Sequence, residues 1–256
     1  MASVHPSPWG WIFPWAELAA VAVLSAAYVG AARRDGTSRP RVVAFAAGVI
    51  LALGVLVSPA ATLAQNYLLS AHLFQNVALA EWAPGLAVLG LSPAMARALA
   101  ALRAIRALTH PLVALALWLG TYAVWHVPVV YDAALRHPGT LLAVEHASYF
   151  LAGALLWWPV LHDVPHHLPS GARAAYVFGA FLFASPLGLL LALLPDPLYP
   201  FYVHAPRLWN VSPLTDKQIA GLIMAGTESV VFFAVFAVYF ARFLAEEDAG
   251  YSPRDA

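Results

Sequence analysis

The chain has 256 residues, of which 62% are hydrophobic and 10% are charged. Soluble domains carry about 25% charged residues, so this composition excludes an ordinary soluble protein and indicates an integral membrane protein. The absence of cysteine excludes disulfides, iron–sulfur clusters and thiolate metal sites. Thirteen basic and 13 acidic residues leave no net formal charge, which gives no indication of a nucleic-acid partner.

Continuous hydrophobic runs, each long enough to cross a bilayer as a helix, follow one another along the chain. These seven runs cover residues 15–32, 42–59, 68–91, 108–126, 140–161, 174–194 and 217–244. They are rich in Leu and Ala and do not alternate, which argues against transmembrane β-strands. We therefore predict an all-α membrane protein in which a seven-transmembrane helix bundle forms a single domain, residues 1–256.

Basic residues are distributed unevenly between the two sides of this predicted bundle. With the N-terminus outside, ten of the 13 Lys and Arg residues fall in cytoplasmic loops or the C-terminal tail. The remaining three, Arg136, Arg207 and Lys217, fall outside. Because cytoplasmic loops carry an excess of Lys and Arg, we predict that the N-terminus is outside and the C-terminus is cytoplasmic.

Three histidines lie near the outer ends of three different predicted spans. His72 begins the third span, His126 ends the fourth, and His146 lies about two turns inside the fifth. Ionisable side chains within spans usually face the bundle interior, and neutral imidazole is the commonest metal ligand in proteins. Met224, near the same end of the seventh span, would add the soft ligand that Cu(I) prefers.

These residues predict a copper site made of His72, His126, His146 and Met224. Zinc also fits the spacing. For each imidazole alone, a hydrogen bond to a loop carbonyl group is the structural alternative.

Further polar residues accompany these histidines. Gln75 and Asn76 lie about one turn after His72 and are expected to line the same polar cavity. Glu145 and Asp132 are candidates to orient the imidazoles by hydrogen bonding.

Two carboxyl side chains, Glu81 and Glu228, are expected near the middle of the membrane, in the third and seventh spans. Such a pair suits a proton path, a metal relay or a partner contact. The alternative is that each is protonated and bonded to a neighbouring hydroxyl or carbonyl group. Pro84 also interrupts the backbone hydrogen bonds of the third span, so protein groups must satisfy the carbonyl that it frees.

Four segments together resemble the CtaG-like cytochrome c oxidase assembly factors, which are seven-span bacterial membrane proteins linked to caa-type oxidases. They are SAHLFQNVALAEWAPGLAVLG (Ser70–Gly90), WHVPVVYDAAL (Trp125–Leu135), LLAVEHASYFLAGALLWWPVL (Leu141–Leu161) and TDKQIAGLIM (Thr215–Met224). The resemblance extends from about Ser70 to Leu244. The residues that match family motif positions are His72, Trp125, His126, Pro128, Tyr131, Asp132, Glu145, His146, Trp157, Trp158, Pro159, Asp216 and Gly221.

The resemblance implies a non-enzymatic protein of the bacterial plasma membrane that helps to mature a haem–copper oxidase. It would handle copper, or hold a nascent oxidase subunit, at the outer face. Its partners would be oxidase subunits or other assembly factors, within the lipid bilayer.

The chain departs from the family pattern at three positions. The family's third helix usually reads His-x-x-x-His followed by Ala-Pro-Pro, and here the second His is replaced by Asn76 and the second Pro by Gly85. After Met224 the family tends to have Trp, where this chain has Ala225. Asn76 is a poorer copper ligand than histidine, so these departures predict weaker metal binding or a changed partner.

Three other classes of function stay open from the sequence, and one of them, favoured by Asn76, is a purely structural scaffold with no cofactor. In a proton or metal-ion transporter or channel, Glu81 and Glu228 would line the path. In a haem- or quinone-binding membrane subunit, His126 and His146 would be axial haem ligands. The chain contains no phosphate-binding Gly-rich loop, no HExxH motif and no G-x-S-x-G motif.

Overall fold

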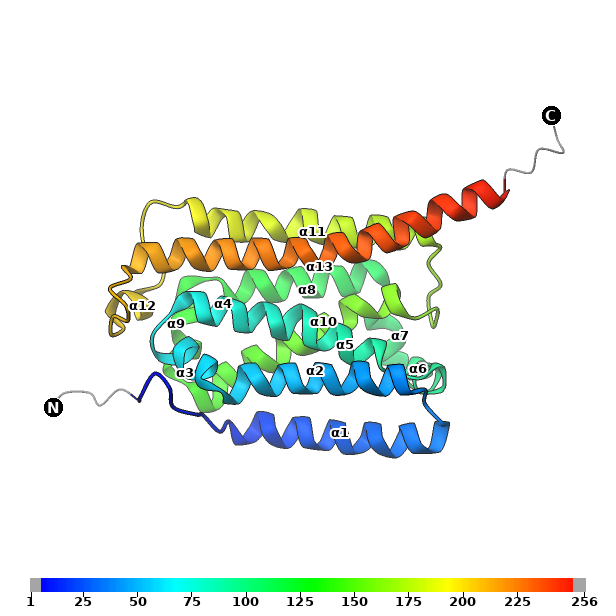
Figure 1. Cartoon of the computed structure of the whole chain (residues 1–256), viewed down its shortest axis with the longest axis horizontal. Coiled ribbons are helices and arrows are strands. Elements are labelled where there is room, and N and C mark those ends of the chain that lie inside the picture. Colours follow the sequence, from blue (N-terminus) through cyan, green and yellow to red (C-terminus); the bar gives the residue numbers. More distant parts are fainter. Residues whose placement is uncertain (1–5, 251–256) are drawn as a thin grey trace.

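The computed structural model describes residues 6–250, and every regular element in that range is a helix (Figure 1). Five helical segments are long and apolar enough to cross a membrane. They are α1 (Trp15–Asp35), α2 (Arg39–Val57), η2–α10 (Pro138–Leu142 and Ala143–Leu161), α11 (Ser170–Leu193) and α13 (Pro213–Gly250). The all-α prediction is confirmed for the described residues.

Two further candidate spans are bent. The run formed by α4 (Leu69–Val77), the π-helix η1 (Ala78–Trp82) and α5 (Ala83–Leu89) meets α6 (Pro93–Ala100) at 112°. Similarly, α8 (Pro111–Trp125) meets α9 (Pro128–Arg136) at 76°. Residues 6–250 therefore contain five candidate membrane spans, or up to seven if each bent pair is one span. The sequence did not predict the short helices α3 (Pro59–Asn66), α6, α7 (Arg103–Leu108), α9 and α12 (Pro200–His204).

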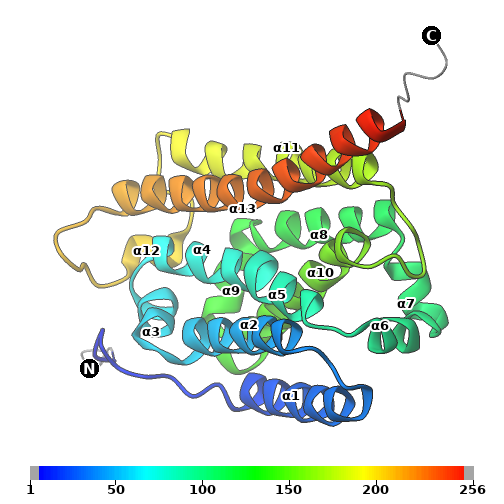
Figure 2. The same ribbon diagram turned by 45° about the vertical axis from the view of Figure 1, so that its right-hand side comes forward.

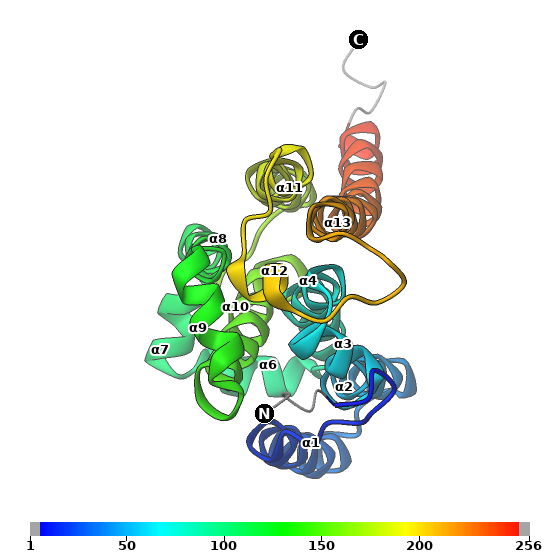
Figure 3. The same ribbon diagram turned by 90° about the vertical axis from the view of Figure 1, so that its left-hand side faces the viewer.

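The helices form a bundle with distinct edges and a polar centre. The antiparallel pair α11 and α13 forms one edge, and α1 packs beside α2 at the opposite edge (Figures 1 and 2). Between the edges lie α8, α10 and the α4–η1–α5 run, as the end-on view shows (Figure 3). Helices α3, α9 and α12 gather at one end of the bundle, which we call the α12 end, and α6 and α7 lie at the other, the α6 end (Figure 1).

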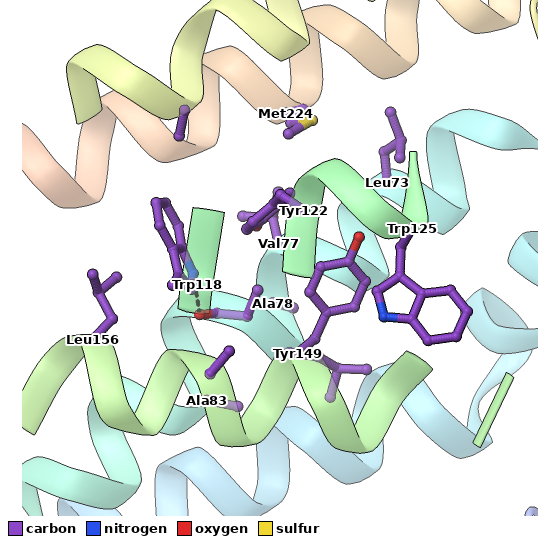
Figure 4. Packing of buried hydrophobic residues seen from close by; sticks show 14 of the residues in the cluster. Leu73, Val77, Ala78, Ala83, Trp118, Tyr122, Trp125, Tyr149, Leu156 and Met224 are labelled. Carbon is purple, nitrogen blue, oxygen red and sulfur yellow. Dashed lines mark hydrogen bonds between the residues drawn. The ribbon is translucent and has the colours of Figure 1, made fainter. Parts of the chain in front are cut away.

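Proline and tryptophan together explain the π-helical turn in the third span. Pro84 has no N–H group to donate to the carbonyl of Ala80, four residues earlier. The indole Nε1 of Trp118 donates to this carbonyl at 3.2 Å (Figure 4), and Trp157 Nε1 donates to the carbonyl of Glu81 at 2.7 Å. The expectation that protein groups satisfy the carbonyl freed by Pro84 is confirmed.

Two glycines allow this arrangement. A Cβ atom on Gly153 of α10 would lie 2.1 Å from the Ala80 carbonyl oxygen, so α10 approaches η1 this closely only because residue 153 has no side chain. A Cβ atom on Gly85 would lie 2.9 Å from Trp157 Nε1. The departure from the family's proline at residue 85 thus makes room for the indole that bonds to the Glu81 carbonyl.

Candidate functional site

The first polar cluster lies towards the α12 end and is centred on Glu145 of α10. His72 of α4 is fully buried, and its Nε2 lies 3.4 Å from Glu145 Oε1. Asn76, one turn later on α4, donates its Nδ2–H to the same carboxylate oxygen at 3.0 Å. The other oxygen of Glu145, Oε2, is buried and has no hydrogen-bond partner.

The hydrogen bonds around His72 identify which ring nitrogen carries a proton. The hydroxyl group of Tyr202 donates its single hydrogen to the carbonyl of Ala64. The same hydroxyl lies 2.8 Å from His72 Nδ1, so it must accept a hydrogen bond from that nitrogen. His72 Nε2 then presents a lone pair towards the Glu145 carboxylate unless it is also protonated. Two acceptors facing each other require a cation, either a proton or a metal ion, to make the contact favourable.

His126 presents a second free lone pair. It ends α8, and its Nδ1 lies 2.9 Å from the carbonyl oxygen of Tyr122. A carbonyl can only accept, so Nδ1 is the donor and Nε2 has the lone pair. This Nε2 is buried without a partner, and the imidazole lies within electrostatic range of both His72 and Glu145.

Tyrosines enclose the two imidazoles. The ring of Tyr131 lies 5.0 Å from that of His72 and 6.2 Å from that of His126, measured between centroids. Tyr131 stacks on Tyr199 at 4.1 Å, and the Tyr199 hydroxyl donates to the carbonyl of His126 at 3.3 Å. Sequence reasoning missed Tyr199 and Tyr202, whose only signal was their spacing of three residues at the start of an unpredicted helix.

Two aspartates position the surrounding helices. Asp132 accepts hydrogen bonds from the backbone N–H of Phe201, at the start of α12, and from Arg136. Asp216 accepts from the backbone N–H groups of Leu69 and Ser70, at the start of α4. Both carboxylates thus satisfy helix N-termini, where negative charge is favourable. In this structure Asp132 supports α12 and does not hydrogen-bond to an imidazole.

The structure places the other predicted ligands elsewhere. Successive residues of a helix point about 100° apart, and His146 faces α1, where its Nδ1 lies 3.4 Å from Glu17 Oε1. Met224 is fully buried in the hydrophobic core, between α13 and α4 (Figure 4). Gln75 donates to the carbonyl of Val55 in α2 at 2.6 Å. Within residues 6–250, no three His, Asp or Glu side chains are already arranged to hold a metal ion.

The second polar cluster lies deeper in the bundle. Glu81 of η1 and Glu228 of α13 are both fully buried, and their carboxyl groups lie close enough to interact electrostatically. The Tyr122 hydroxyl donates to Glu81 Oε1 at 3.1 Å. No N–H or O–H group of the described residues reaches Glu81 Oε2 or either oxygen of Glu228. The sequence placed both residues near mid-membrane but could not show that they meet.

Comparison with known proteins gives a family for this arrangement. Residues 23–246 match the family described as cytochrome c oxidase caa3 assembly factor (Caa3_CtaG). No curated protein and no solved structure is found to match the chain. Since the match covers most of the 256 residues, the chain belongs to the family of cytochrome c oxidase caa3 assembly factors.

Proposed function

We propose that this protein is a non-enzymatic assembly factor for a haem–copper oxidase and handles copper at the outer face of the bacterial plasma membrane. Membership of the caa3 assembly-factor family supports the oxidase as the target. Arginines at the end of α1, at the starts of α2 and α11 and in α6 and α7 support a cytoplasmic α6 end. The α12 end, with the His72–Glu145 cluster, then faces outwards.

One observation carries the copper proposal. His72 Nε2, His126 Nε2 and Glu145 Oε2 come from three segments of the bundle, are buried together, and have no hydrogen-bond partners. Buried polar atoms are nearly always satisfied in folded proteins, so three unsatisfied acceptors in one cluster fit a site that binds a cation. Imidazole ligands suit copper and zinc, and zinc also accepts a carboxylate oxygen.

The arrangement favours transient binding. Within residues 6–250, no three of these side chains already enclose an ion, so binding would require His72, His126 and Glu145 to move together. Copper is the cargo in this proposal, and a site that must close around it would release it more readily than a rigid one. His146 and Met224 remain proposed ligands that would join only after a larger rearrangement.

Copper stoichiometry tests the proposal directly. Purified, reduced protein supplied with Cu(I) is expected to retain about one copper ion per chain, and the double variant His72→Ala/His126→Ala is expected to lose it. Single variants His146→Ala and Met224→Leu measure the contribution of the two distant residues. His137→Ala is the matched control, because His137 is exposed after α9 and its imidazole bonds to the backbone carbonyl of Ala133, away from the His72–Glu145 cluster. Copper retained in the double variant would refute the site.

A hollow at the α12 end favours a second function, holding a nascent oxidase subunit. It encloses about 490 Å³ and is lined in part by Gln65, Asn66, Arg136, Phe201 and His204. Its polar and aromatic lining suits a peptide segment that emerges at the membrane surface. If wild-type protein binds no copper, co-purification of an oxidase subunit with wild type, lost in Phe201→Glu, would support this function.

A further inference from the structure

The Glu81–Glu228 pair has no cation to balance it. Neither side chain takes part in any ion pair between residues 6 and 250. The titratable groups that face the pair are the phenols of Tyr122 on α8 and Tyr149 on α10, which are neutral hydroxyl groups. Two interacting carboxylates that are shielded from water and from positive charge strongly disfavour double ionisation.

A single shared proton removes the repulsion between the two carboxyl groups. Carboxylate oxygens only accept hydrogen bonds, whereas a carboxylic acid also donates one. A single proton on either side chain therefore creates a hydrogen bond between the two carboxyl groups. The Tyr122 hydroxyl supplies a second donor to Glu81 Oε1. One proton and one phenol thus give each carboxyl group a hydrogen bond, with one negative charge shared between the two residues.

Tyr149 points to a route towards this site from the α12 end. Its hydroxyl is fully buried and has no hydrogen-bond partner. The hydroxyl lies within electrostatic range of Glu228 in the deeper cluster and of Glu145 in the His72 cluster. Its ring packs against that of Tyr122, with 5.1 Å between centroids, and Figure 4 shows the hydroxyl pointing into the space beside α8. An unpartnered hydroxyl between two carboxyl sites can receive a hydrogen bond from one side and donate one to the other.

We propose that Glu81 and Glu228 form a binding site for one exchangeable proton, reached from the α12 end through the hydroxyl of Tyr149. Protonation forms one O–H bond on a carboxylate. Transfer through the Tyr149 hydroxyl forms one O–H bond as another breaks, so the phenol is restored, and release of the proton reverses these transfers. This site is distinct from the proposed copper ligands and does not depend on copper binding.

Infrared spectroscopy of the purified full-length protein counts the protons. We expect the carboxylic acid C=O band to lose the intensity of one acid group in Glu81→Gln/Glu228→Gln. Each single Gln variant should retain one acid group at a shifted frequency, because the remaining Glu is buried without a cation. Glu247→Gln is the control, since this side chain is exposed on the last turns of α13, and its acid band should equal that of the wild type.

Three results would overturn the proposal. Loss of two acid groups in the double variant would mean that both residues are protonated. An unchanged band would mean that both are ionised and that a metal or alkali cation, not a proton, occupies the site. Acid intensity that is absent from both single variants would mean that neither remaining Glu holds a proton by burial. If the double variant does not fold, the acid-band intensities of the wild type and Glu228→Gln are compared instead. Equal intensities indicate one acid group in the wild-type pair, and a loss of one group in Glu228→Gln indicates two.

The route is tested by the rate at which the acid band shifts after transfer to D₂O. Tyr149→Phe is expected to slow this exchange several-fold and to leave the number of acid groups unchanged. Tyr176→Phe is the matched control, because Tyr176 of α11 also has an unpartnered buried hydroxyl but faces no carboxyl group. Equal exchange rates in the two variants would remove Tyr149 from the proposal.

Discussion

Glu145 and Glu81 are the same residue type, both fully buried in the bundle, yet their neighbours are opposite in character. Glu145 lies beside an imidazole nitrogen and an amide N–H group. Glu81 lies beside a second carboxyl group and a phenol. Positive or donating neighbours stabilise a carboxylate, whereas a second carboxylate destabilises it. The first environment therefore suits a permanent negative charge that attracts a cation, and the second suits a proton that is taken up and released.

Both environments depend on how closely α10 approaches the third span. Gly153 of α10 contacts η1, which carries Glu81, and Glu145 lies about two turns earlier on α10, against His72. The close approach at Gly153 is thus one packing contact that affects both clusters, and the variants below separate their contributions.

The largest effect is expected from Gly153→Ala, which breaks both clusters together. The new Cβ atom would lie 2.1 Å from the backbone oxygen of Ala80, which cannot rotate away. Overpacking of this kind costs about 1–3 kcal/mol and sometimes more, so we expect a clear decrease in the thermal melting temperature of the purified protein. Gly179→Ala of α11 is the control, because no atom of a neighbouring element lies within 4 Å of the position that its Cβ would take. Similar melting temperatures for the two variants would contradict the packing described.

A pair of isosteric variants compares the two carboxyl environments directly. Glu145→Gln removes the negative charge that attracts the cation between His72 Nε2 and Glu145, which is a proton when no metal is present, and is expected to decrease stability by about 1–2 kcal/mol. Glu228→Gln introduces an amide N–H group that can donate to Glu81, and is expected to change stability by less than about 0.5 kcal/mol. Thermal melting in detergent without added metal measures both. Equal losses would show that the two carboxyl groups do not differ as described.

Asn76→His tests whether the cluster around Glu145 binds a metal ion. The family usually has histidine at this position, and Asn76 Nδ2 already lies 3.0 Å from Glu145 Oε1. A third imidazole beside this carboxylate is expected to strengthen Cu(I) binding by about tenfold, measured by competition with a chelator of known affinity. Glu81→His, in the deeper cluster, is expected to give no such gain. Unchanged affinity in Asn76→His would argue against a cation site around Glu145.

The sequence predicted most of the fold. The hydrophobic runs 68–91 and 140–161 correspond to the observed helical segments 69–89 and 138–161, because apolar length is a direct requirement of the bilayer. Short helices such as α9 and α12 escaped prediction. Tertiary contacts stabilise them, including the carboxylate of Asp132 at the start of α12, and both are too short to appear as hydrophobic runs of membrane length.

The candidate site was less predictable, because helix rotation decides which side chains meet. Depth along a span placed His72, His126 and His146 at one level, but rotation separates His146 from Glu145 and turns it towards Glu17. Prediction of the contact between Glu81 and Glu228 would have required knowledge that α13 packs against the third span. A single sequence indicates how deep a residue lies along its span. It does not indicate how each helix is rotated about its own axis.

The smallest expected effect concerns His162, at the α6 end, which provides a buried imidazole without a buried carboxylate beside it. It follows the last residue of α10, and its Nε2 lies 3.0 Å from the carbonyl of Val88, to which it donates. Burial is the main cause that lowers the pKa of His162 below its ordinary value of 6.5. Its stabilising contribution is therefore complete above pH 6.5 and is lost as the pH falls from 6.5 through the folded-state pKa.

The variant His162→Gln retains an N–H donor for Val88 but cannot titrate. At about pH 8 we expect its stability to lie within about 1 kcal/mol of the wild type. As the pH is lowered below 6.5, the wild type should lose stability faster than the variant, so the difference between their melting temperatures should shift in favour of the variant. His167→Gln is the control, because this imidazole is exposed and pairs with Asp163 at the surface. A constant difference across this pH range would mean that burial of His162 does not favour its neutral form, which would remove the contrast with the imidazole of His72 beside its carboxylate.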